Sequence, residues 1–325
     1  MQIDLQIGGQ AVRLHEAEDR PAFLWPCWPF DLFFSDPANS ETPPDIDIEV
    51  VVSKKLPELV HGNMIFDADH GLWKLYENGT DYYLETFDTK THEPYTRSFI
   101  SNNFGKIRLW FQESLDPLEK KQMGWIPAKL INPVLEICLL TRIAREGGVF
   151  LHASAVKLGP AAYVFSGPSG AGKSTIAELF VDRIDCPVLS DEKIILRRQA
   201  EQIMVYGTPW YGSSRRAANQ NASLDRLFLI SHGLGQHLVR PLSFLEWTRR
   251  FLRECSLPFW DRAGMEQTMI FLGDLSRQVE CLELSFLKEP DVVEFLQEQV
   301  PPRPLSSSNV FVEDLDSRYK HSEMT

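Results

Sequence analysis

One short segment constrains this chain more than any other. Residues 167–175 read GPSGAGKST, which satisfies the spacing G-x-x-x-x-G-K-[ST]. The apolar stretch Tyr163–Phe165 precedes it, and a helical pattern follows from Ser174. Glycines permit backbone conformations and close approaches that other residues resist, so that consecutive N–H groups can point at one anion. The following helix adds its positive N-terminal end. The segment therefore predicts a phosphate-binding loop between a strand and a helix.

Two side chains of this loop carry chemistry of their own. Lys173 is expected to reach the β- and γ-phosphates of a nucleoside triphosphate, and the Ser174 hydroxyl is expected to ligate Mg²⁺. ATP and Mg²⁺ are therefore the predicted ligands. Guanine recognition is disfavoured because NKxD is absent, and the DxxG match at 261–264 stands alone. The predicted nucleotide contacts are Gly167, Ser169, Gly170, Ala171, Gly172, Lys173, Ser174, Thr175 and Arg215.

Two neighbouring acids follow the loop helix. A predicted strand over 186–190 ends in Asp191 and Glu192, and the carboxyl ends of sheet strands face the ligand in folds of this kind. Adjacent side chains leave a strand on opposite faces. We therefore expect Asp191 to be the catalytic base and Glu192 to bind the metal with Ser174, although the sequence leaves open which acid is the base. A solvated acidic turn is the alternative, and Asp274 is a rival acid whose surroundings favour a helix.

A histidine and an arginine complete the predicted site. His152 stands on a predicted strand over 149–156, where it can hold charge or modulate a neighbouring carboxylate. It joins Asp191 and Lys173 as a predicted catalytic residue, and a purely structural histidine is the alternative. The stretch 206–212 (YGTPWYG) is expected to lie near the site, with Arg215 after it available for phosphate. A solvated arginine in an ordinary turn is the competing interpretation.

Together these residues resemble the HPr kinase/phosphorylase family. The family pattern is a histidine on a strand, a hairpin, GxxGxGKS, a helix, and a strand that ends in two acids. Residues 151–175 (LHASAVKLGPAAYVFSGPSGAGKST) and 186–194 (CPVLSDEKI) follow that order. The resemblance covers about residues 130–240 and implies a core akin to phosphoenolpyruvate carboxykinase. It also implies an active-site role for His152 and a proton-transfer role for Asp191. Thr175 departs from the acid common in the family, and Glu192 stands in place of a second aspartate.

The predicted fold class is α/β, with a P-loop core of this HPr-kinase type and a strand-rich N-terminal domain. We expect the N-terminal domain over 1–125, the catalytic domain over 126–300 and a mobile polar tail over 301–325. Predicted strands cover 1–7, 46–52, 72–76, 82–87, 107–111, 149–156, 161–166, 186–190, 193–198, 203–206, 226–231 and 279–286. One predicted helix begins at Asn132-Pro133. Four further predicted helices cover 174–184, 244–255, 265–275 and 291–299. The N-terminal aromatics fit either a core or a partner surface.

Composition restricts the classes of partner and the compartment expected for this chain. The formal net charge is −12 and basic residues form no run, which disfavours nucleic acid and anionic membranes as partners. The five cysteines include no CxxC pair, which argues against a disulfide framework or a zinc ribbon. No apolar stretch is long enough to span a bilayer, and the first ten residues hold no apolar signal core. We therefore expect a cytoplasmic protein.

The leading functional hypothesis is an ATP-dependent kinase. Its acceptor would be a hydroxyl, either a serine of a protein or peptide or a small metabolite. A nucleotide-gated binding module with little or no phosphotransfer is the alternative. A carboxykinase is a third candidate, for which Arg215 and Arg216 are the available arginines. A homo-oligomer is compatible with each of these.

Overall fold

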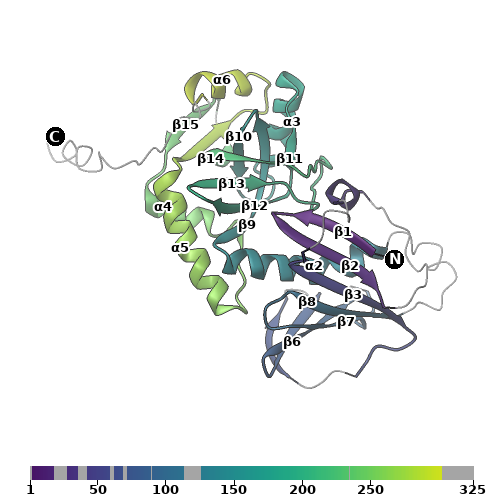
Figure 1. The fold of residues 1–325 in the computed structure, drawn as a ribbon. Helices are drawn as coiled ribbons and strands as arrows, with labels where there is room; N and C mark the ends of the chain where they lie inside the picture. The colour runs from purple at the N-terminus through teal and green to yellow at the C-terminus, as the bar shows by residue number, and fades with distance from the viewer. Residues whose placement is uncertain are drawn as a thin grey trace.

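The computed structural model describes residues 2–17, 28–35, 42–58, 62–68, 72–88, 90–112, 126–233 and 235–301. Within these ranges the chain is mixed α/β, with two sheets and five α-helices. Figure 1 shows the N-terminal sheet at one end of the molecule and the second sheet at the other. The predicted tail over 301–325 lies outside the described residues apart from Pro301, so its mobility stays a prediction.

The predicted strand-rich N-terminal part forms one eight-stranded sheet, in the order β1-β2-β3-β8-β7-β6-β5-β4. The five strands predicted here are confirmed, whereas β2, β4 and β7 were not predicted. Apolar residues alternate along the strands, as in β8, where Ile107, Leu109 and Phe111 are buried. The strands are β1 Gln2–Ile7, β2 Gln10–Glu16, β3 Ile46–Ser53, β4 Asn63–Asp67, β5 Trp73–Asn78, β6 Asp81–Phe87, β7 Pro94–Ile100 and β8 Lys106–Gln112, with a 3₁₀ helix η1 at Phe30–Phe33.

The second sheet is nine-stranded, in the order β10-β9-β12-β13-β14-β17-β15, with β11 and β16 both paired to β9. Strand β10 also pairs with β14, so the ring β10-β9-β12-β13-β14 closes on itself. The β10–β14 and β14–β17 pairs are parallel and the others are antiparallel. The strands are β9 Gly148–Leu158, β10 Ala161–Ser166, β11 Val188–Ser190, β12 Lys193–Gln199, β13 Gln202–Tyr206, β14 Asn221–His232, β15 Leu238–Pro241, β16 Cys255–Ser256 and β17 Cys281–Phe286.

Helices cover both faces of the second sheet because its central strands are apolar on both sides. In β10, Val164 packs into the core under α4 and α5, while Tyr163 and Phe165 pack into the core under α3 and α6. This alternation is what a period of two residues produces in a fully buried strand. The helices are α3 Lys173–Ile184, α4 Phe244–Phe251, α5 Arg262–Gln278 and α6 Val292–Gln299. The helix predicted over 265–275 is thereby confirmed, with Asp274 inside it.

Helix α2, Ile126–Arg145, lies between the two sheets (Figure 1). Its residues from Val134 onward share one apolar core with the N-terminal sheet and with Phe150 and Ile195 of the second sheet. The helix start predicted at Asn132-Pro133 is wrong, because Pro133 lies inside the helix. Packing on both sides stabilises the helix beyond what local propensity indicates. Asn132 caps nothing there and instead accepts a hydrogen bond from Trp210 Nε1 at 2.5 Å.

The predicted helix over 244–255 is also too long. Helix α4 ends at Phe251, and Cys255 belongs to β16, which pairs with β9. The pairing of residues 255–256 with β9 is a tertiary contact that local sequence does not encode. None of the described helices is long and apolar enough to cross a membrane. The four described cysteines, Cys138, Cys186, Cys255 and Cys281, are free thiols.

Candidate active site

The segment between β10 and α3, predicted to be a phosphate loop, is a tight turn that depends on glycine. Gly170 and Gly172 have φ of +80° and +106°, in the left-handed region that favours glycine. Gly167 is closely packed, because a Cβ there would lie 3.0 Å from the carbonyl oxygen of Ile230. Buried Ser154 of β9 anchors the end of the loop by donating to the carbonyl oxygen of Lys173 at 2.7 Å.

Lys173 is buried at the start of α3 and folds back over the loop. Its Nζ donates to the carbonyl oxygens of Gly167 at 2.7 Å and Pro168 at 3.2 Å. Burial lowers the pKa of Lys173, while the nearby carboxylates of Glu254 and Glu192 act to raise it. The ammonium group therefore lies within electrostatic reach of two acids, and only one of them was predicted to belong to the site.

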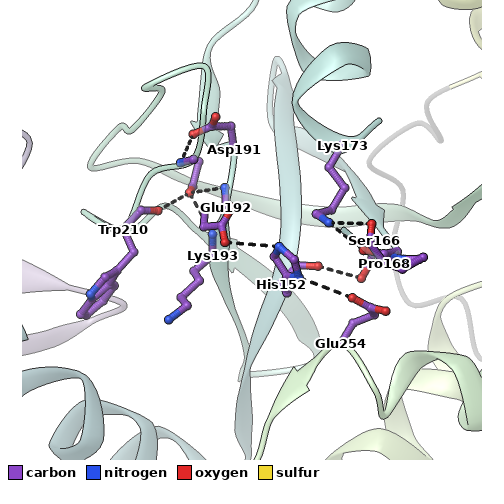
Figure 2. Close-up of polar contacts among 12 residues, drawn as sticks. His152, Ser166, Pro168, Lys173, Asp191, Glu192, Lys193, Trp210 and Glu254 are labelled. Atoms are coloured by element: carbon purple, nitrogen blue, oxygen red, sulfur yellow. Dashed lines mark hydrogen bonds and ion pairs between the residues drawn. The ribbon is translucent and has the colours of Figure 1, made fainter. Parts of the chain in front are cut away.

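His152 lies between these two acids, as Figure 2 shows. Its Nε2 is 3.3 Å from Glu192 Oε1, and its Nδ1 is 3.5 Å from Glu254 Oε2. A neutral imidazole has one donor nitrogen, whereas the doubly protonated ring has two. Each ring nitrogen of His152 therefore faces one carboxylate.

Strand pairing brings these three residues together. His152 lies opposite Lys193 in the β9–β12 pair, and the adjacent Ala153 N–H donates to the carbonyl oxygen of Glu192 at 3.0 Å. On the other side, the His152 N–H donates to the carbonyl oxygen of Glu254 at 2.8 Å, just before β16. Backbone hydrogen bonds thus hold the main chain of Glu192 and of Glu254 next to β9. Each carboxylate therefore lies within reach of the His152 ring.

Asp191 occupies a different environment from its neighbour. Its carboxylate is fully buried and accepts backbone N–H groups from Gly212 at 2.8 Å, Ser214 at 2.8 Å and Arg216 at 3.2 Å. The Glu192 side chain, in contrast, is 39% exposed. Asp191 therefore holds the loop after the YGTPWYG stretch, and its two oxygens are already engaged.

Replacing Asp191 with asparagine should therefore unfold this loop as well as impair the site. An asparagine amide has one acceptor oxygen and presents N–H groups to the N–H donors of the loop. The loss of a buried acceptor of this kind costs about 1–3 kcal/mol, which is measurable as a lower midpoint of urea unfolding. Asp185→Asn is the matched control, since Asp185 is exposed and has φ of +48°, which asparagine tolerates. Equal midpoints for both variants would show that Asp191 does not hold the loop.

The YGTPWYG stretch links the site to the N-terminal part of the chain, in agreement with its predicted nearness to the acids. Ser190 Oγ donates to the carbonyl oxygen of Trp210 at 2.9 Å. The Trp210 ring packs edge-on against Phe30 of η1 and Phe150 of β9. Gly207 is obligatory here, because a Cβ would lie 2.0 Å from the carbonyl oxygen of Ala218. Trp210 therefore connects η1 of the N-terminal part to Ser190, the residue just before the acids.

A cleft of about 460 Å³ opens beside the phosphate loop. Arg250 in its wall is paired with Glu283 at 2.6 Å. Arg253 is exposed and forms no ion pair with any residue that the structure describes. The lining residues are Gly167, Pro168, Ser169, Gly170, Ala171, Leu229, Ile230, Ser231, His232, Arg250, Arg253 and Glu254.

Sequence reasoning missed Glu254 and Arg253. Both follow α4 far along the chain from the loop, and neither belongs to a recognisable motif. The amphipathic pattern of α4 was the nearest signal, but it does not reveal what lies across the cleft.

Two acids that the sequence offered as alternatives have structural roles. Asp261, in the DxxG match, is the N-cap of α5 and accepts a hydrogen bond from Gly264 N–H at 2.8 Å, so the match marks a helix start. Asp274 is ion-paired with Arg198 and Arg277.

The predicted arginine does not line the cleft. Arg215 lies over the rings of Trp28 and Tyr211, and Arg216 is bound bidentately by Glu178 at 2.9 Å. Ser174 and Thr175 lie in the first turn of α3 and are partly exposed. The structure thus brings His152, Glu192 and Glu254 together, whereas Arg215 does not line the cleft.

The donor set fits Mg²⁺ as a ligand shared with phosphate. Among the described residues, no three His, Cys, Asp or Glu side chains gather into a metal-binding group. Mg²⁺ usually takes only one or two protein oxygens and completes its shell with phosphate and water. The Ser174 hydroxyl beside the loop and the accessible Glu192 carboxylate are oxygen ligands of the number that Mg²⁺ usually takes from a protein.

Comparison of the sequence with protein-family models and with curated proteins gave no match.

Proposed function

We propose that this chain is an ATP-dependent kinase that transfers the γ-phosphoryl group to a hydroxyl of a protein serine or a small metabolite. One observation carries the proposal. The lysine of a glycine-rich phosphate loop lies within electrostatic reach of Glu192, an accessible carboxylate that His152 holds. The resemblance to the HPr kinase/phosphorylase family and its carboxykinase-like core supports the same reaction.

The binding roles follow from the positions of the cations. The loop N–H groups and Lys173 would hold the β- and γ-phosphates, and the positive end of α3 would add to the attraction. Arg253 is the exposed cation of the cleft and would approach the same phosphates from the far wall. Ser174 would hold Mg²⁺, which when bound neutralises charge on the phosphate oxygens.

The proton of the acceptor hydroxyl needs a carboxylate with a free oxygen. We assign this role to Glu192, because three backbone N–H groups already engage Asp191. The acceptor oxygen forms a bond to the γ-phosphorus as its proton passes to Glu192. The bond from the γ-phosphorus to the bridging oxygen breaks, and ADP leaves with that electron pair. His152 acts through Glu192 as a positioning residue, and Glu254 orients His152.

Gly212 offers a sensitive check on the placement of Glu192. A Cβ at Gly212 would lie 2.9 Å from Glu192 Oε2 and 3.1 Å from both the carbonyl oxygen and Oδ2 of Asp191. Gly212→Ala should push the Glu192 carboxylate away from His152 and lower the transfer rate by up to about 10²-fold, the effect of a displacement near 1 Å. Because a flexible carboxylate yields more easily than a packed core, the free energy of unfolding should fall by no more than about 1 kcal/mol.

The control for this variant is Gly273→Ala. Gly273 lies within α5, where a Cβ meets nothing closer than 3.9 Å, and alanine favours helix. Transfer rates and urea midpoints of both variants would be compared with the wild type. Full transfer activity in Gly212→Ala would contradict the assignment of Glu192.

A transfer assay tests the proposed function as a whole. ATP labelled at the γ-phosphate would be incubated with the full chain, Mg²⁺ and a cell extract separated into protein and small-molecule fractions. Label on an acceptor in either fraction, dependent on the added chain, supports the kinase. Tight ATP binding without transfer to either fraction would instead favour the nucleotide-gated binding module.

A further inference from the structure

Two distant parts of the chain build a cationic aromatic platform at the end of the YGTPWYG stretch. Trp28 precedes η1 in the N-terminal part, whereas Tyr211 and Arg215 belong to the loop held by Asp191. The Trp28 and Tyr211 ring centres are 4.6 Å apart. The Arg215 guanidinium carbon lies 4.9 Å from the centre of the Trp28 ring and 5.8 Å from that of Tyr211.

The platform is anchored to the acids by short connections. The Arg215 N–H donates to the carbonyl oxygen of Gly212 at 3.2 Å, closing a tight turn in which Arg215 has φ of +53°. Gly212 itself abuts the Glu192 carboxylate and donates its N–H to Asp191. The backbone turn from Gly212 to Arg215 therefore joins the platform to the residue that abuts the Glu192 carboxylate.

The surface is open and positively charged. The residues Trp28 and Tyr211 are each 38% exposed. Arg215 is exposed and has no acidic partner among the residues that the structure describes, while the adjacent Arg216 is neutralised by Glu178. Stacking on aromatic rings occupies the face of a guanidinium and leaves its N–H edge available to a planar anion.

We propose that this platform binds an anionic group, a carboxylate or phosphate, that the acceptor carries close to its reacting hydroxyl. The role as an acceptor site rests on the proposed kinase function, whereas the anion binding does not. The platform also gives the N-terminal part a role, since Trp28 completes a specificity element for a site built by the second sheet. Because an acidic peptide and a small hydroxy acid share this chemistry, the test must treat them separately.

The test measures binding by calorimetry to the full chain loaded with ADP and Mg²⁺, without phosphoryl transfer. One arm compares a serine peptide flanked by glutamates with its glutamine-flanked counterpart. The other arm compares glycerate with glycerol. The anionic member of at least one pair should bind about tenfold or more tightly than the neutral member, as charge-assisted hydrogen bonding produces. The arm that discriminates identifies the source of the anion.

Substitutions show whether the preference for the anionic ligand depends on the platform. Arg215→Gln should reduce the preference to less than about twofold, and Arg215→Lys should keep part of it, since lysine retains the charge but not the planar fork. Arg249→Gln, an exposed arginine of α4 that the cleft does not include, should keep it in full. Absence of binding in both arms, equal binding of charged and neutral members, or a preference that survives in Arg215→Gln would each overturn the proposal. ADP binding and the separate transfer assay test the proposed kinase function. A failure of anion binding at the platform can therefore be distinguished from a failure of the kinase proposal.

Discussion

Replacing Lys173 with methionine should lower phosphoryl transfer by about 10²-fold or more. The ammonium group is the one buried cation of the phosphate loop, within the part of the chain that the structure describes. Removing a single preorganised donor from a site where charge develops costs about 10²–10³ in rate. Methionine preserves much of the length and bulk of the side chain, so the effect would come from the missing charge. Single-turnover transfer and equilibrium ATP binding would be measured together.

The same substitution should leave the fold nearly intact. Burial lowers the pKa of Lys173, which means that the charged form is less stable there than in water. An apolar side chain avoids that penalty and loses two hydrogen bonds to loop carbonyls, worth about 1 kcal/mol each in net terms. The free energy of unfolding should therefore change by about 1 kcal/mol or less. Lys55→Met, at an exposed position of the N-terminal part, is the matched control. Normal ATP binding and transfer in Lys173→Met would refute the phosphate loop.

Glu192→Gln should reduce transfer by about 10²–10⁴-fold, the usual contribution of a positioned base. Glutamine has the same shape but cannot accept the proton, and it replaces the carboxylate that lies 3.3 Å from His152 Nε2 by an uncharged amide. ATP binding should persist, since the loop and Lys173 are unchanged. Unlike Asp191→Asn, this variant should keep the wild-type midpoint of unfolding, because Glu192 supports no loop. Comparing the two variants therefore distinguishes the acid that accepts the proton from the acid that stabilises the loop.

Magnesium dependence distinguishes the two roles that an accessible carboxylate can have. If Glu192 takes the proton, transfer by Glu192→Gln stays low at every Mg²⁺ concentration. If it were chiefly a metal ligand, as the sequence predicts for it, a high Mg²⁺ concentration would restore much of the rate. Glu289→Gln, an exposed acid after β17, serves as the control for the loss of one negative charge. Full transfer in Glu192→Gln at ordinary Mg²⁺ concentrations would leave Glu192 without either role.

Local sequence predicted those parts of the site that one short segment can encode. Gly167, Gly170 and Gly172 are needed for backbone conformation and close contact within a single turn, so their spacing alone indicated the loop. Strand β10 and helix α3 on either side were likewise predicted from periodicity. The nearness of His152 to the acids followed from a hairpin and one further strand, an arrangement that few residues suffice to specify.

The errors arose where distant segments meet. The helix start at Pro133 was wrong because packing between two sheets overrides a local signal, and the end of α4 was wrong because β9 pairs with β16. Glu254 reaches His152 only through that pairing. No periodicity or motif within α4 indicates which acid will lie across a cleft.

By itself, the sequence determined that the chain builds a glycine-rich turn between a buried strand and a helix, because glycine spacing and hydrophobic period act over a few neighbouring residues. The tertiary structure alone decided that Asp191 faces three loop N–H groups, that Glu192 faces His152, and that Trp28 meets Arg215. Adjacent residues on a strand end differ in environment according to what packs on each side, and that depends on segments far along the chain.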